Sequence, residues 1–134
     1  IKLENDLKNS KYVMIDRERF MRVVLNIIGN SKKYMDKTHG QITIFLRETN
    51  LSIIIEIRDN GCGIGQDNVN KIFNRFYRED SSRSNISGSG LGLAISKQIV
   101  EGHNGKIWAI SHGTEGTSII ISLGKIINTY RQER

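Results

Sequence analysis

The chain has no proline, one cysteine and no long apolar run, and these shortages exclude several classes of protein. The single cysteine, Cys62, excludes an internal disulfide framework and fits a reducing compartment. No apolar run approaches the roughly 20 residues that cross a bilayer, and no signal peptide opens the sequence. We therefore expect no direct membrane insertion of this fragment. No cysteine or histidine spacing matches a zinc site.

The positive charges lack the arrangement that nucleic acid requires. The formal net charge is +6, but the lysines and arginines are scattered. There is no dense basic run and no aromatic stripe of the kind that stacks on single strands. We expect no nucleic-acid partner, because phosphate groups on a small ligand account more simply for positive residues near glycine-rich loops.

The remaining composition is that of one soluble globular domain. Its 134 residues suffice for one hydrophobic core. The sequence begins at Ile1, without methionine and in mid-pattern, so we expect a fragment of a longer protein. We divide it into the end of a linker (1–10), a globular domain (11–124) and a polar C-terminal tail (125–134).

Hydrophobic periodicity predicts an α+β fold. The expected strands cover residues 12–15, 41–47, 52–58, 106–111 and 117–123, and the expected helices cover 17–35, 67–73 and 90–101. Apolar residues three and four apart make the first helix amphipathic, and Ile53, Ile55 and Ile57 share one face of strand 52–58. We therefore predict a mostly antiparallel sheet of about five strands, covered on one face by about three helices.

The segment Asp59-Asn60-Gly61-Cys62-Gly63-Ile64-Gly65 is the most informative stretch. A carboxylate at the end of a strand can accept a hydrogen bond from the exocyclic amine of adenine, whereas guanine presents a carbonyl oxygen there. The glycines allow the backbone to approach the base and to adopt positive φ. The alternative is an ordinary turn, although a simple hairpin turn needs only one or two glycines.

A polar stripe runs along the first expected helix beside its apolar stripe. It contains Asn26, Asn30, Lys33 and Tyr34, which share one side at helical spacing. Asparagine oxygens can ligate Mg²⁺, and the lysine can reach phosphate. The alternative is a solvated helix face. Asparagine is a mediocre helix former, however, so this pair needs a reason.

A second glycine cluster, Gly88-Ser89-Gly90-Leu91-Gly92-Leu93, opens the third expected helix. Free N–H groups at a helix N-terminus bind phosphate. The cluster matches neither the dinucleotide fingerprint nor the P-loop. The polar residues between Arg78 and Gly88 form either a lid that closes over phosphate or a disordered loop.

Together these segments resemble the catalytic ATP-binding domain of bacterial sensor histidine kinases, in the GHKL superfamily that also contains gyrase B and Hsp90. Residues 26–34 resemble the family's N box, and residues 59–64 resemble its G1 box. Residues 72–78 resemble its F box, and residues 88–93 resemble its G2 box. Four boxes in the family's order, over nearly the whole chain, are far more specific than any one box. Ser31, Gln66 and Ser87 depart from the usual Ala, Pro and Gly, and no departure touches an expected ligand.

The resemblance implies a two-layer α/β sandwich of the Bergerat type that binds ATP and Mg²⁺. It implies that Asp59 binds the adenine amine and that Asn26 and Asn30 hold the metal. The implied catalytic residues are Asn26, Asn30, Lys33 and Arg78. The implied nucleotide-binding residues are Asn30, Lys33, Tyr34, Asp59, Gly61, Gly63, Ile64, Phe73, Gly88, Ser89, Gly90, Leu91, Gly92, Leu93 and Thr117.

The resemblance also implies a function. The domain would donate the γ-phosphate of ATP to a histidine on a separate dimerisation domain of the same protein, from which it passes to a response regulator. Residues 1–10 would then end the linker from that domain, and the chain would be a cytoplasmic part of a membrane-anchored protein.

Three other functions stay open within the same superfamily. An ATPase usually has a glutamate at the position of Asn26, and asparagine cannot act as a base. A serine kinase of the anti-sigma-factor type would yield an acid-stable phosphoserine. A nucleotide-sensing module would bind nucleotide without phosphorylating a supplied domain.

Overall fold

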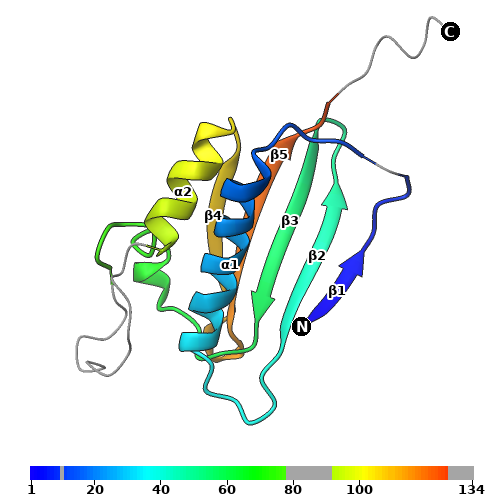
Figure 1. Cartoon of the computed structure of the whole chain (residues 1–134). Helices are drawn as coiled ribbons and strands as arrows, with labels where there is room; N and C mark the ends of the chain where they lie inside the picture. Colours follow the sequence, from blue (N-terminus) through cyan, green and yellow to red (C-terminus); the bar gives the residue numbers. More distant parts are fainter. Residues whose placement is uncertain (10, 78–91, 127–134) are drawn as a thin grey trace, which may run out of the picture.

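The computed structural model describes residues 1–9, 11–77 and 92–126. Its strands are β1 (Lys2–Asn5), β2 (Ile42–Glu48), β3 (Ser52–Asp59), β4 (Lys106–Ser111) and β5 (Thr117–Gly124), and its α-helices are α1 (Arg17–Lys33) and α2 (Gly92–Gly102). Two short 3-10 helices are η1 (Gln66–Asn68) and η2 (Gly113–Glu115). The α-helices lie side by side on one face of the sheet (Figure 1). The predicted α+β sandwich is confirmed, with two α-helices rather than three in the described ranges.

The five strands form one mixed sheet in the order β1-β2-β3-β5-β4. β1 runs parallel to β2, and the other neighbouring pairs are antiparallel. At the end of β3, Asp59 is paired with Ile42 on one side and with Thr117 on the other. The carboxylate singled out in the sequence therefore ends the central strand of the sheet.

Burial of the apolar stripe of α1 explains why this segment is helical and how it packs. Asp16 caps the helix, because its Oδ1 accepts a hydrogen bond from the backbone N–H of Arg19 at 3.1 Å. Val23 and Ile27 have no exposed surface and pack against the sheet. Burial of such a side chain contributes about 1.5–3 kcal/mol. The side opposite this stripe stays in solvent, as an amphipathic pattern predicts.

The prediction of a strand over residues 12–15 is wrong. The strand at the edge of the sheet beside β2 is β1 instead. Residues 1–10, expected to be the end of a linker, contain this strand. All four residues of β1 are exposed, so its main-chain pairing with β2 holds it rather than burial. Residues 12–15 instead lie beside the residues that follow β5, because the carbonyl of Tyr12 accepts a hydrogen bond from the backbone N–H of Ile126 at 2.8 Å. Val13 packs against the core, whereas Met14 is 79% exposed.

The expected helix over residues 67–73 is also wrong. η1 is followed by turns in which Lys71 donates to Asn68 and Asn74 donates to Lys71, each at three-residue spacing. The segment carries several asparagines, which compete with the helical hydrogen-bond ladder. These turns still bury Ile72 and Phe73 in the core. The apolar pattern was therefore correct about burial and wrong about the backbone.

The face of the sheet away from the helices carries a buried carboxylate. Glu56 is only 4% exposed, and its side chain is paired with Arg47 at 2.8 Å and Arg58 at 2.9 Å. The hydroxyl of Ser118 also donates to it at 2.7 Å. Burial alone would raise the pKa of Glu56. The hydrogen bonds from Ser118 and Arg47 and the positive charge of Arg58 outweigh it and hold that pKa below its usual range.

Candidate functional site

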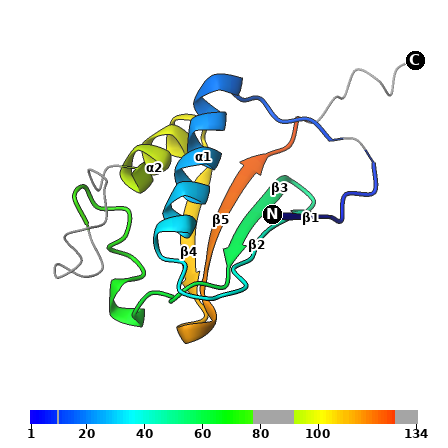
Figure 2. The same ribbon diagram turned by 60° about the horizontal axis from the view of Figure 1, so that its bottom comes forward.

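Three loops meet at one end of the molecule, below the C-terminal end of α1. One loop follows α1, another follows β3, and the third connects β4 to β5 (Figure 2). Backbone contacts join the first two, because Asn60 donates to the carbonyl of Gln41 at 3.2 Å and Cys62 donates to the carbonyl of Tyr34 at 3.1 Å. This end brings the G1-type segment and the end of the polar stripe of α1 together.

Asp59 is held in a defined orientation at this end. Its Oδ1 accepts hydrogen bonds from the backbone N–H groups of Gly61 at 3.0 Å and Thr117 at 3.3 Å. Among the described residues, no donor contacts Oδ2. One carboxylate oxygen is thus used to position the group, while the other remains free to accept a hydrogen bond from a ligand.

Two glycines in the same loop are required by close backbone packing. A Cβ on Gly61 would lie 2.6 Å from the carbonyl oxygen of Tyr34. Gly63 has φ +80, and a Cβ there would collide with the carbonyl oxygen of Gly113. Any side chain at either position would separate the loops around Asp59. The glycines predicted to allow close approach do so here to neighbouring protein backbone.

Several other predicted nucleotide-binding residues support the site from the core. Phe73, Leu93 and Thr117 are each less than a tenth exposed. Thr117 contributes through its backbone N–H to Asp59. Ile64 is half-buried against the core, and its carbonyl accepts a hydrogen bond from Ser111. The side chains of Phe73 and Leu93 belong to the hydrophobic core, and that of Ile64 packs against it.

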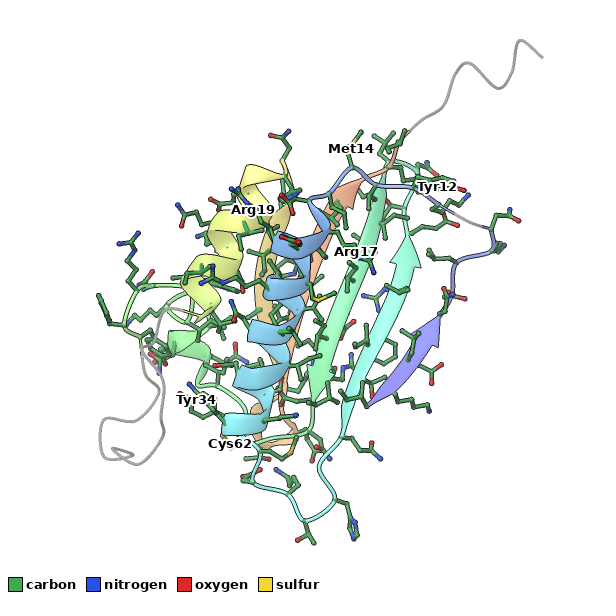
Figure 3. All side chains as sticks on the ribbon, in the orientation of Figure 1. Tyr12, Met14, Arg17, Arg19, Tyr34 and Cys62 are labelled. Carbon is green, nitrogen blue, oxygen red and sulfur yellow. The ribbon has the colours of Figure 1, made fainter. Side chains whose placement is uncertain are left out.

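The end of α1 presents the polar stripe. Tyr34 forms the C-cap, and its carbonyl accepts the hydrogen bond from the backbone N–H of Cys62; both residues are labelled near the base of the helix in Figure 3. Lys33 is exposed and Asn30 is half-buried. Neither side chain has a hydrogen bond or ion pair with another described residue. Within the described part of the chain, the Asn30 amide and the Lys33 ammonium are therefore both available to contact an anion, or a cation that is paired with an anion.

Asn26, one turn before Asn30, faces the start of α2. Its Nδ2 donates to the carbonyl of Gly92 at 3.2 Å and is 3.5 Å from the hydroxyl of Ser96. This use of the amide nitrogen leaves Oδ1, the atom that a hard cation requires, without a donor in the described part of the chain. The structure therefore brings Asn26 and Gly92 together, as the predicted site requires.

Part of the predicted site lies outside the described residues. Arg78, Gly88, Ser89, Gly90, Leu91 and the expected lid between Arg78 and Gly88 belong to this part. Within the described residues, no helix has the length and apolar character to cross a bilayer.

Sequence reasoning missed two residues that shape the site. The side chain of Asn60 accepts from the N–H of Gln41 at 2.7 Å and donates to the carbonyl of His39 at 3.1 Å. Lys37, in the loop after α1, contacts both of the other loops. Asn60 lies in the G1-type segment, but no role was assigned to its side chain, and Lys37 had no sequence signal beyond its place in a turn, because partners so distant in sequence have no fixed spacing.

Comparison with known proteins places this geometry in a family. The profile of the family described as "Histidine kinase-, DNA gyrase B-, and HSP90-like ATPase" matches residues 15–126. The sensor protein kinase WalK of Staphylococcus haemolyticus is 44% identical over 115 residues, which are 84% of this chain and 19% of that protein. The chain thus spans about a fifth of the length of this curated relative.

Solved structures agree with the sequence comparison. The mycobacterial sensor histidine kinase MprB superposes with a TM-score of 0.80 at 32% identity, over 92% of this chain and 83% of that one. A nucleotide-free catalytic domain of the histidine kinase ThkA superposes with a TM-score of 0.76 at 27% identity, over 92% of this chain and 78% of that one. The resemblance inferred from the four boxes is therefore confirmed.

Proposed function

The chain belongs to the histidine kinase-, DNA gyrase B- and HSP90-like ATPase family, as an ATP-binding domain of the sensor histidine kinase type, and we propose that it donates the γ-phosphate of Mg-ATP to a histidine on another domain. The observation that carries the proposal is the Asp59 carboxylate. Backbone donors fix its Oδ1, and its Oδ2 is free to accept the adenine amine. With the base bound at this end, we expect the phosphates to approach Asn26, Asn30 and Gly92.

The donors on α1 fit a magnesium–phosphate group. The Oδ1 atoms of Asn26 and Asn30 are hard ligands one helical turn apart and without other hydrogen-bond donors in the described residues. When bound, Mg²⁺ would neutralise charge on the phosphates. Lys33, exposed near the end of the same helix, adds a positive charge that can approach phosphate oxygens.

This chain positions the phosphoryl group rather than forming a covalent bond with it. A nitrogen of the acceptor imidazole attacks the γ-phosphorus, and an N–P bond forms. The bond to the β–γ bridging oxygen breaks, and ADP leaves with that electron pair. The imidazole proton passes to a base outside this chain. Asn26 cannot activate water as a base, which favours transfer to a protein over hydrolysis.

The remaining partners belong to the whole protein. The acceptor histidine would lie on a dimerisation domain of the same protein, and the phosphoryl group would pass from it to an aspartate of a response regulator. The sensor-kinase relatives, of which this chain represents about a fifth, support a partner domain in the same protein, and the response regulator is part of our proposal.

A phosphotransfer assay tests the proposal. The purified chain is incubated with radiolabelled ATP, Mg²⁺ and a separately expressed dimerisation domain, and a variant lacking the acceptor histidine serves as the control. We expect label on the dimerisation domain that is lost in acid. Acid-stable label would indicate a serine kinase, phosphate release without an acceptor would indicate an ATPase, and nucleotide binding with no label would indicate a sensing module.

A further inference from the structure

Lys37 joins the three loops around Asp59, although it lies in a turn with no recognised motif. Its Nζ donates to the carbonyl of Gly61 at 3.2 Å and to the carbonyl of Thr114 at 2.9 Å. It is also 2.9 Å from Oδ1 of Asp36. An ammonium has three N–H donors, so these contacts use its full capacity.

The two carbonyls belong to the loops that supply the donors to Asp59. Gly61 donates its own N–H to Oδ1 of Asp59, and Thr114 lies in the turn that leads into Thr117, the second donor. Both ends of the Gly61–Cys62 peptide are fixed to the segment after α1. Its carbonyl oxygen accepts from Lys37, and its N–H donates to the carbonyl of Tyr34.

We propose that Lys37 is a positioning residue for adenine recognition, because it holds together the two loops that orient the Asp59 carboxylate. The inference rests on the proposed function, and it concerns how the site distinguishes one base from another. Lys37 acts on the base only through Asp59. It should therefore affect the distinction between a 6-amino and a 6-oxo purine, and should leave the contribution of the phosphates unchanged.

Two properties of the site support a role in positioning rather than in stability. The Lys37 ammonium is partly exposed, so its pairing with Asp36 is screened by water and contributes little to folding. Its contact with Gly61, in contrast, is part-buried and lies two residues from Asp59. Loss of this contact removes one of the two hydrogen bonds that fix the Gly61–Cys62 peptide, while the sheet and helices remain packed by the core.

The test measures the affinities of ADP, ATP and inosine diphosphate by calorimetry for the chain and for Lys37→Met. We expect the preference for ADP over inosine diphosphate to fall about three- to tenfold, the effect of one hydrogen bond, with the ATP-to-ADP ratio unchanged. Lys37→Arg, which keeps its donors, should restore most of the preference. Lys37→Gln, with a shorter donor, should lie between them if the methionine variant folds poorly.

Lys32→Met is the matched control. This variant also removes one positive charge, here from the last turn of α1, and the Lys32 ammonium contacts no described residue. We expect the control to keep the full base preference. Equal weakening of ADP and inosine diphosphate in Lys37→Met would overturn the positioning role, and so would a changed ATP-to-ADP ratio, which would make Lys37 a phosphate ligand. If the parent chain itself showed no preference for ADP, the proposed base recognition would fail first.

Discussion

Replacing Asp59 by asparagine changes one oxygen of the group that should read the base. The variant can keep Oδ1 as the acceptor from Gly61 and Thr117, whose N–H groups lie 3.0 and 3.3 Å away. Oδ2 becomes an amide NH₂, which cannot accept from the adenine amine. A hydrogen bond to a charged group contributes about 1.5–3 kcal/mol, so ATP affinity should fall about 10- to 150-fold.

Titration calorimetry with ATP and GTP checks this expectation. The parent chain should prefer ATP, and Asp59→Asn should lose most of that preference, because the new NH₂ can donate to the guanine oxygen. Asp67→Asn is the control, since it neutralises an exposed carboxylate with no contact among the described residues. A variant that binds ATP within twofold of the parent, with an unchanged ATP-to-GTP ratio, would refute the assignment of Asp59.

Three further perturbations test the metal ligands, the loop packing and the sheet. Asn30→Ala should weaken ATP binding by ~1–2 kcal/mol in Mg²⁺, measured by calorimetry, because a metal ligand is lost. An equal loss in chelator would disprove a metal role. Gly63→Ala should destabilise the fold by at least ~1–3 kcal/mol in thermal denaturation, because φ is +80 and its Cβ would strike Gly113. Gly29→Ala, whose Cβ meets nothing within 4 Å, should instead stabilise by ~0.5–1 kcal/mol, and equal effects would contradict the packing described. The folded-state pKa of Glu56 lies below 4.5, so its contribution to stability is present above pH 4.5 and is lost as pH falls through that lower pKa. Denaturant unfolding of Glu56→Gln should lack this part of the acid dependence, and an identical pH profile would show that Ser118 and the two arginines do not lower the pKa of Glu56.

The core could be predicted from the sequence where burial imposes a period. Val23 and Ile27 follow the helical repeat, and Ile55 and Ile57 follow the strand alternation, because each element buries one face. β1 could not be found in this way. Its exposed residues are held by main-chain hydrogen bonds to β2, and such bonds leave no hydrophobic pattern.

The site could be predicted only where its residues stand close together in the sequence. The spacing of Asn26 and Asn30 on one helix face, and the position of Asp59 at a strand end, follow from local geometry. The contacts of Lys37 depend on how three loops meet, with partners 24 and 77 residues away. No spacing rule connects such residues, so only the folded chain reveals them.

A crystal structure of this chain with a non-hydrolysable ATP analogue and Mg²⁺ tests the account most directly. The account predicts the adenine amine within hydrogen-bond distance of Oδ2 of Asp59, with Oδ1 still held by Gly61 and Thr117. An analogue bound elsewhere, or an Asp59 side chain turned toward solvent and away from the base, would contradict it.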